Sequence, residues 1–157
     1  SGFARDSILK TGNWLGPLLV AAAESGVEKL LVFGYHGKVI KLAGGIFHTH
    51  HHLADGRMEV LISLAVAEGL PLHMIQKINE ADSVEAALLK LESLNMQFAQ
   101  NLWSRVAAAV EKRSNTYVSH YGSWPIDIGA ALFDRQRQLR WVGPFGSIHL
   151  KNLGITI

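Results

Sequence analysis

Residues 29–45, KLLVFGYHGKVIKLAGG, join a short apolar run to a helical pattern through a turn that contains glycine. Residues 29–34 are hydrophobic almost without a break and end at Gly34, the pattern of a strand covered on both faces in a parallel sheet. The residues after the turn predict a short helix, with Lys38 and Lys41 three positions apart on one of its faces. A strand, a tight turn and a helix in this order are typical of an α/β domain, which binds ligands at such turns.

Helical patterns flank this unit on both sides. Residues 11–26 predict an amphipathic helix with Asn13 as its N-cap. Residues 54–69 are apolar almost all round, which predicts a central helix buried by several neighbours. Further helices are expected over residues 71–81 and, as one long or broken stretch with an apolar stripe, over residues 83–114, with Ser83 and Glu85 near a helix cap.

The last third of the chain carries three short runs that favour strands, at residues 116–122, 126–135 and 139–143. The second and third runs are predicted to pair as a hairpin across residues 136–138. We therefore expect one domain over residues 1–157 with an α/β fold. It is a three-layer domain with a partly parallel sheet flanked by helices and a C-terminal β-hairpin, and the KLLVFG run is expected to be an inner strand.

Composition narrows the class of protein. With 48% hydrophobic and 18% charged residues, the 157-residue chain has the composition of a globular protein. Its apolar runs are far shorter than a membrane span and no signal-like segment opens the sequence, so we expect no membrane partner and a cytoplasmic protein. The lack of cysteine excludes thiolate nucleophiles and cysteine-based metal sites. The formal charge is +2 with scattered Lys and Arg, which favours a small ligand with several carboxylates over nucleic acid.

Two motifs have the residue types of a functional site. The turn at residues 34–38 has glycines that let a ligand approach the backbone and a helix start that offers N–H groups to an anion. Its GYHGK sequence matches neither a phosphate-binding loop nor the dinucleotide fingerprint. Asp55 and Glu59 lie one turn apart on a predicted apolar helix. Glu59 either lies with Ser63 on a solvent-exposed stripe of this helix or faces a ligand pocket. We adopt the pocket as the hypothesis for Glu59, because its helix has almost no polar face. The turn at residues 34–38 is expected to open this pocket and to share it with Asn13 and Asp55.

The HTHHH segment at residues 48–52 is the third candidate. A metallo-hydrolase of the His-x-His-x-Asp-His type needs its Asp two residues after the second His, whereas Asp55 follows three residues after His52. The pair His48-x-His50 alone is common and unspecific. A dedicated metal site is therefore not the preferred interpretation of this cluster.

Taken together, GNWLG, GYHGKVIKLAGG, TH and ADGRMEVL resemble the cobalt-precorrin-5B methyltransferase family, the CbiD family of anaerobic cobalamin biosynthesis. The segment ALFDRQRQL is similar to the closing hairpin of the family, so the resemblance covers nearly the whole chain. Tyr35 and His36 depart from the pattern, which has His and then a variable residue, and His51 stands where Ser is common. The matching positions are Gly12, Asn13, Gly16, Gly34, Gly37, Lys38, Lys41, Leu42, Ala43, Gly45, Thr49, His50, Ala54, Asp55, Arg57, Met58 and Glu59.

The resemblance implies transfer of a methyl group from S-adenosylmethionine to carbon 1 of a cobalt-containing tetrapyrrole. Family members are longer, with a preceding domain, so the chain resembles their C-terminal domain. The family's cofactor-binding role falls on Asn13, Gly34, His36, Gly37 and Thr49, substrate binding on Lys38, Lys41 and Arg57, and catalysis on His50, Asp55 and Glu59. His50 is expected in a ligand-facing lid, with His48, His51 and His52 peripheral to it.

The sulfonium is already a strong electrophile, so the protein must mainly align the reactants, exclude water and hold charge. No metal bound by the protein is expected to be required. Two alternatives remain open from the sequence. One is a histidine-dependent metal hydrolase, and the other is a non-catalytic domain that binds a tetrapyrrole or a protein partner. A homo-oligomer is also left open.

Overall fold

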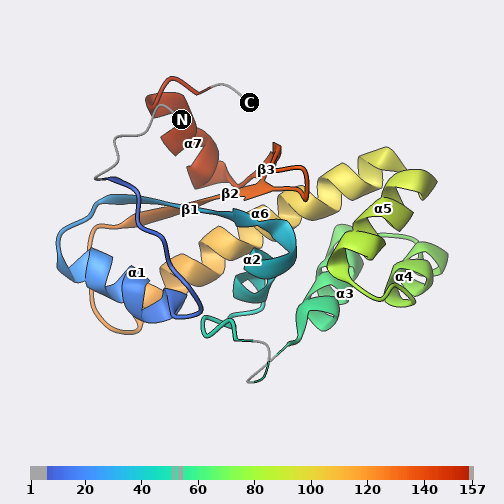
Figure 1. Cartoon of the computed structure of the whole chain (residues 1–157), viewed down its shortest axis with the longest axis horizontal. Helices are drawn as coiled ribbons and strands as arrows, with labels where there is room; N and C mark the ends of the chain where they lie inside the picture. The colour runs from blue at the N-terminus through green and yellow to red at the C-terminus, as the bar shows by residue number, and fades with distance from the viewer. Residues whose placement is uncertain (1–6, 51, 53–54, 156–157) are drawn as a thin grey trace.

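The computed structural model describes residues 7–50, 52 and 55–155, and it contains a three-stranded sheet surrounded by helices (Figure 1). In chain order the elements are α1 (Leu15–Glu24), β1 (Lys29–Tyr35), α2 (His36–Ala43), α3 (Arg57–Glu68), α4 (Leu72–Asn79), α5 (Val84–Leu94), α6 (Met96–Ser119), β2 (Asp127–Phe133), β3 (Leu139–Val142) and α7 (Pro144–Asn152). The chain is thus a mixed α/β protein, as the order of strand and helix patterns predicted. None of the helices in the described part of the chain is long and apolar enough to cross a membrane.

The sheet has the order β1-β2-β3. β1 pairs in parallel with β2 from Lys29 opposite Asp127 to Tyr35 opposite Phe133, and β2 pairs antiparallel with β3. The predicted hairpin is therefore confirmed, and so is the partly parallel sheet. The prediction that residues 29–34 form an inner strand is wrong for the described sheet, because β1 lies at its edge and β2 is central. The apolar pattern of a strand reports burial of its faces and not the position of its neighbours.

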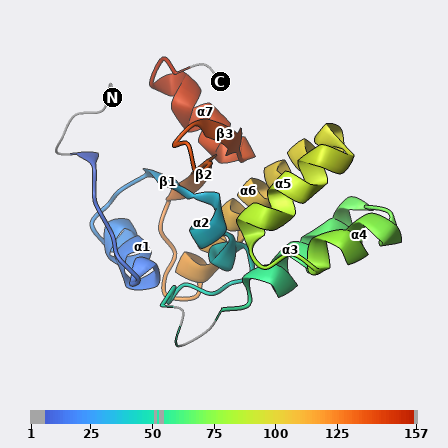
Figure 2. The ribbon, with the colours of Figure 1, turned by 45° about the vertical axis from the view of Figure 1, so that its right-hand side comes forward.

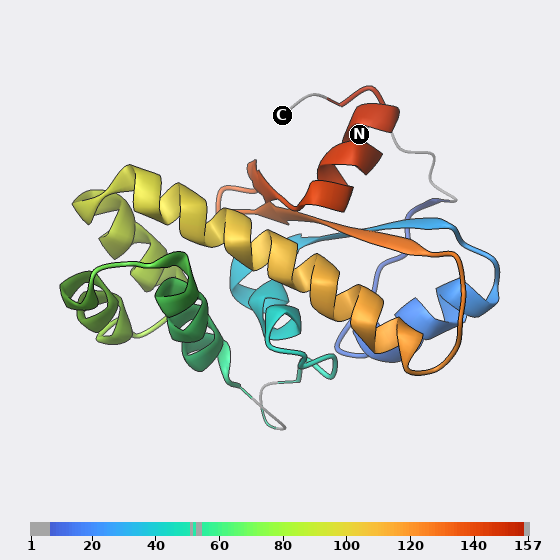
Figure 3. The ribbon, with the colours of Figure 1, turned by 180° about the vertical axis from the view of Figure 1, so that it is seen from behind.

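Helices lie on both faces of the sheet. Figures 1 and 3 show α7 on one face and α1, α2 and α6 on the other. The 24-residue helix α6 contributes one face to the core, where its Leu102, Trp103, Val106 and Val110 are fully buried. In Figure 2 the helices α3, α4 and α5 gather near one end of α6, away from α1. This arrangement leaves α2 between the sheet and the α3–α5 group.

The start of α5 and the division between α5 and α6 follow from local capping. The Ser83 hydroxyl accepts a hydrogen bond from the Ala86 amide, which confirms the cap expected near this residue. Asn95 interrupts the long helical stretch, and its Oδ1 accepts from the amide of Phe98 to start α6. The strand predicted at residues 116–122 is wrong, because α6 continues to Ser119 and buries Val118 along its apolar stripe. Burial in the core overrides the strand preference of this segment.

Helix α3 departs most from its prediction. We expected it at the centre, yet Leu61 and Ala65 are its buried residues, and Val66 is 62% exposed. An apolar sequence removes the polar face by which an outer helix is normally identified, so its position was misjudged. Helix α7 was not predicted, although Gly143 followed by Pro144 at the first helical position is a recognised helix start.

Candidate functional site

Two segments that are far apart in the sequence meet at Asn13 and Thr49. The Thr49 amide donates a hydrogen bond to the Asn13 carbonyl at 3.0 Å, and its hydroxyl lies 3.3 Å from Asn13 Oδ1. Trp14 and His48 form a neighbouring antiparallel bridge. The predicted role of Asn13 as the N-cap of α1 is wrong, because Trp14 precedes the helix and the Asn13 side chain turns to Thr49. The GNWLG and TH motifs, which the family resemblance linked, are thus in contact.

Lys41 connects this pair of segments to Asp55. Its side chain is buried near the end of α2, and Nζ donates to the Thr49 carbonyl at 3.3 Å and lies 4.0 Å from Asp55 Oδ1. Asp55 also accepts two hydrogen bonds from Arg57, at 2.5 Å from Nε and 2.8 Å from Nη2. These hydrogen bonds lower the pKa of Asp55 to about 2, so the carboxylate is charged across the physiological range. We call Asn13, Lys41, Thr49, Asp55 and Arg57 the Lys41 cluster.

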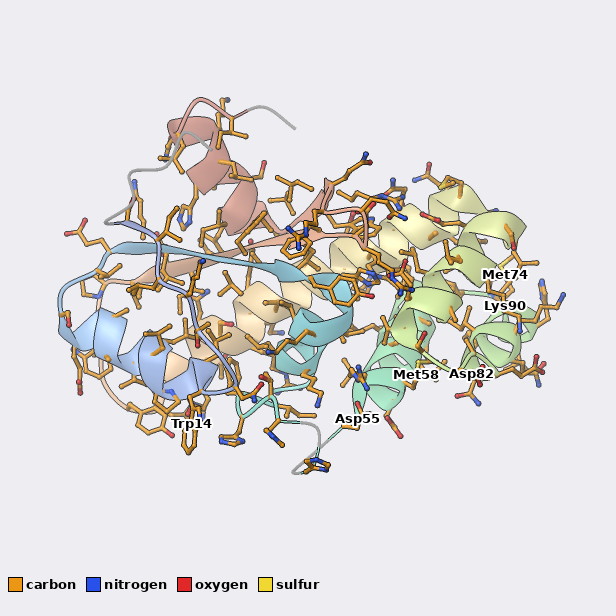
Figure 4. The ribbon with its side chains drawn as sticks, in the orientation of Figure 1. Trp14, Asp55, Met58, Met74, Asp82 and Lys90 are labelled. Atoms are coloured by element: carbon orange, nitrogen blue, oxygen red, sulfur yellow. The ribbon has the colours of Figure 1, made fainter. Side chains whose placement is uncertain are left out.

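The charged residues around this cluster differ in exposure. Lys38 is exposed whereas Lys41 is buried, so the two lysines do not present a common exposed edge as predicted. Glu59 and Ser63 are both exposed, so α3 has a solvent-exposed polar stripe, contrary to the assumption on which the pocket role of Glu59 was based. Figure 4 shows Asp55 at one end of α3, on the same side of the molecule as Trp14.

The histidine segment adjoins the Lys41 cluster through Thr49. His50 is half-buried, its ring lies 5.1 Å from that of His52, and its Nδ1 accepts from the amide of His52 at 3.4 Å. His48 packs edge-on against Trp14 with 4.4 Å between ring centroids. His51 lies outside the described residues. Among the residues that the structure does describe, no three His, Asp or Glu side chains are arranged to hold a metal ion.

A second cluster of polar groups lies at the other end of α2, where β1 ends. His36 is fully buried, with Nδ1 2.8 Å from the indole nitrogen of Trp103 and Nε2 2.8 Å from Glu85 Oε2. Because an indole N–H can only donate, Nδ1 must accept, and a neutral ring therefore carries its proton on Nε2 and donates it to Glu85. The same Glu85 oxygen accepts from the Tyr35 hydroxyl at 2.8 Å. We call Tyr35, His36, Glu85 and Trp103 the His36 cluster.

Burial sets the protonation of this second cluster. Desolvation lowers the pKa of His36, although Glu85 opposes this effect, and the ring is neutral near pH 7. Desolvation also raises the pKa of Tyr35 to about 12, assisted by its hydrogen bond to Glu85. Arg57 and Arg135 act on Tyr35 in the opposite direction.

These contacts argue against the interpretation that the glycines at residues 34 and 37 leave space for a ligand. A side chain at Gly34 would collide with Val39, and a Cβ at Gly37 would lie 2.7 Å from the ring of Tyr35. Both glycines are therefore required by packing inside the chain, and the space beside them is filled by protein side chains. His36 has no exposed surface and both its ring nitrogens are bonded within the chain, so in this structure it positions its neighbours and does not face a cofactor.

The predicted common pocket is divided into two parts. Gly34 precedes the first residue of α2, whereas Lys41, which lies near Asp55, is in its last turn, and a helix of eight residues is about 12 Å long. Two open cavities lie elsewhere. One of about 540 Å³ is bordered by residues 118–124 at the end of α6, and one of about 600 Å³ lies between α6 and the start of α7. Neither cavity is lined by a residue of the two clusters.

Sequence reasoning missed three members of the His36 cluster. Tyr35 was noted only as a departure from a pattern, Glu85 only as a residue near a helix cap, and Trp103 not at all. An acidic residue in the first turn of a helix is common, because it favours the helix dipole, so Glu85 gave no signal of a buried partner. The one signal that pointed to this place was His36, which directly follows the strand that the sequence predicted to be buried.

The fold and these contacts define a mixed α/β protein with polar clusters at the two ends of one helix, α2. Residues 48–144 match the family described as CbiD, C-terminal domain. The chain belongs to the CbiD family. No solved structure matches it.

Curated relatives agree with this assignment. A protein of Prochlorococcus marinus (strain MIT 9303) is 63% identical over 155 residues, which are 99% of this chain and 40% of the relative. One of Synechococcus sp. (strain CC9902) is 60% identical over 137 residues, which are 87% of this chain and 38% of the relative. Both are named cobalt-precorrin-5B C(1)-methyltransferase. The chain thus spans about two fifths of the length of these relatives.

Proposed function

We propose that this chain forms part of an enzyme that transfers a methyl group from S-adenosylmethionine to carbon 1 of cobalt-precorrin-5B in cobalamin biosynthesis. The observation that carries this proposal is the 63% identity to a protein of that name over 99% of the chain. A match of this extent covers the segments of both polar clusters, and not a single motif.

The Lys41 cluster fits the demands of methyl transfer from a sulfonium. The reaction needs alignment of donor and acceptor and a held negative charge near the positive sulfur, and it needs no covalent intermediate. Asp55 is a charged carboxylate with about half of its side chain exposed, so it is available to ribose hydroxyls or to the sulfonium. Lys41 connects Asp55 to Thr49, whose hydroxyl contacts Asn13, and in this proposal these residues supply further polar atoms for the methyl donor.

The basic residues divide into two roles in this proposal. Lys38 and the partly exposed Arg57 face the peripheral carboxylates of the tetrapyrrole. Lys41 is buried, and it holds the 47–50 segment and Asp55 in place instead of contacting substrate. Glu59 and the His36 cluster have no direct contact with the reactants in this account.

His50 is assigned the direct role within the histidine segment, because it follows Thr49 and thus adjoins the Lys41 cluster. His48 packs on Trp14, and His52 contacts His50, so both lie at the border of the proposed site. Attack of a carbon nucleophile on a sulfonium has no step that demands a Lewis acid, so we propose that the enzyme requires no metal of its own. The cobalt belongs to the substrate.

Calorimetric titration with S-adenosylhomocysteine tests the proposal at the level of binding. The full-length MIT 9303 relative, with its matching region replaced by this chain, is the protein to titrate, since this chain spans only part of the enzyme. We expect saturable binding that Asp55→Asn weakens by about tenfold, the value of one lost charge-assisted contact. Glu59→Gln, a charge change on the exposed stripe of α3, is the matched control and should leave affinity unchanged. Corrinoid binding without any affinity for the nucleoside would favour the non-catalytic tetrapyrrole-binding alternative.

A further inference from the structure

The face of the sheet that carries α7 has an aromatic group in which Phe33 is exposed while Tyr35 and Phe133 are half-buried. Phe33 is 60% exposed, its ring lies 5.1 Å from that of Phe133, and the Phe133 ring lies 6.4 Å from that of Tyr35. We call these three residues the aromatic face. It lies toward the carboxyl ends of β1 and β2.

The opposite face of the same two strands is fully packed. Val32 on β1 and Ile128, Ala130 and Leu132 on β2 are buried there within the core. On the α7 side, the helix sits tightly against the middle of β2, where a Cβ at Gly129 would lie 2.6 Å from the Gly146 amide nitrogen. This contact covers β2 and leaves Phe33 on β1 open.

Such a face is unusual for a parallel strand pair. Parallel strands are normally covered on both faces, and the KLLVFG sequence is apolar on both faces accordingly. In addition, within the described residues no strand pairs with the outer edge of β1. An open strand edge beside an exposed aromatic side chain is a site for association and aggregation unless something covers it.

We infer that the aromatic face and the adjoining edge of β1 form the interface with the remainder of the longer CbiD polypeptide. The chain spans only 40% of the MIT 9303 relative, so the larger part of such a protein lies outside these residues. That part is the occupant with enough chain to cover the face, and its contacting surface must be apolar. This inference does not depend on the methyltransferase reaction.

Hydrogen exchange measured by mass spectrometry tests the interface directly. The two samples are this chain alone and the full-length MIT 9303 relative in which this chain replaces the matching region. Peptides covering β1 should exchange slower by about tenfold or more in the longer protein, because an interface closes the local openings of an edge strand. Peptides covering the central strand β2 provide the internal control. Equal exchange of β1 in the two samples would overturn the inference.

Paired substitutions locate the interface. Phe33→Lys should lower the melting temperature of the longer protein by about 3 °C or more beyond its effect in this chain alone. Val66→Lys, on the exposed side of α3, should have the same effect in both proteins. Should Phe33→Lys prevent folding, Phe33→Ser is the milder variant for the same comparison. If Val66→Lys instead lowered the melting temperature more in the longer protein than in this chain alone, the interface would lie on α3 and the inference would be overturned. A dimer of this chain alone that Phe33→Lys dissociates would identify a second copy as the occupant, and would overturn it as well.

Discussion

Glu85 and His36 are 49 positions apart in the sequence and share a buried hydrogen bond of 2.8 Å between Oε2 and Nε2. This bond joins the start of α5 to the start of α2 at the end of β1. The same carboxylate oxygen holds the hydroxyl of Tyr35, and His36 is held from its other side by Trp103. One acidic side chain therefore fixes the turn that the sequence singled out as a ligand site.

Removal of this carboxylate should destabilise the chain. Glu85→Leu leaves the His36 N–H and the Tyr35 hydroxyl without their acceptor, and we expect a loss of about 1–3 kcal/mol in the free energy of unfolding. Urea denaturation followed by circular dichroism measures it. Glu80→Leu is the control, because Glu80 forms an exposed ion pair with Lys90 and such pairs contribute little. Equal effects of the two substitutions would show that the buried bonds are not stabilising.

The neutral state of His36 predicts a dependence of stability on pH. Its pKa is lowered in the folded chain, so the unfolded chain binds more protons as the pH falls below the usual value of 6.5. The contribution of His36 is therefore complete above pH 6.5 and is lost as the pH decreases toward its folded pKa. We expect His36→Asn to be less stable at pH 8 and to lose less stability between pH 7 and pH 5. A variant with the same slope as the parent chain would exclude His36 as the source.

Glu111 provides the anchor of α7. It is buried on α6, and its carboxylate accepts hydrogen bonds from the amides of Ala130, Phe145 and Gly146 at 2.7–3.0 Å. Glu111→Ala leaves three amides without their acceptor and should cost about 3 kcal/mol or more. Glu111→Gln, which keeps one acceptor oxygen, should lose less. Hydrogen exchange of α7 should increase first in the alanine variant, and unchanged protection of α7 would contradict the anchoring role.

Sequence patterns predicted the elements of this fold better than their places. The apolar run of β1, the hairpin and the cap at Ser83 all have local causes, and the structure contains them. The edge position of β1 depends on pairing with residues almost a hundred positions later, which no local pattern reports. Helix α3 was placed at the centre for the same reason, since apolar side chains do not say which neighbours cover them.

For the candidate site, too, the sequence predicted which residues belong together but not how they are oriented. The motifs identified Asn13, Thr49, Lys41 and Asp55, and the structure brings these residues together. Their orientation was not predictable, because a helical pattern does not report that Lys41 is buried with its Nζ bonded to the Thr49 carbonyl while Lys38 is exposed. The glycines at 34 and 37 were read as openings for a ligand, but Val39 and Tyr35 fill those spaces. Glycine permits close approach of any group, and its sequence position alone does not identify that group.

The histidine segment gives a prediction about metal dependence. Chelation of the full-length enzyme before the cobalt-containing substrate is added should leave methyl transfer unchanged. His50→Ala should lower turnover by about tenfold, the rate equivalent of about 1.4 kcal/mol for one lost hydrogen bond. His52→Ala, at the border of the proposed site, is the matched control. Activity that is lost on chelation and restored by zinc would contradict the metal-free proposal, and equal effects of the two variants would remove the special role of His50.

The central claim is tested most directly by the rate of methyl transfer to carbon 1 of cobalt-precorrin-5B. The full-length MIT 9303 relative carrying this chain should catalyse the reaction, and Asp55→Asn should reduce its kcat/KM by about tenfold or more, or at least 1.4 kcal/mol of transition-state stabilisation. Glu59→Gln should remain within about twofold of the parent. Product formation followed by mass spectrometry distinguishes the methylated corrinoid from its precursor. A parent-like rate in Asp55→Asn, or an inactive hybrid beside an active intact relative, would contradict the account.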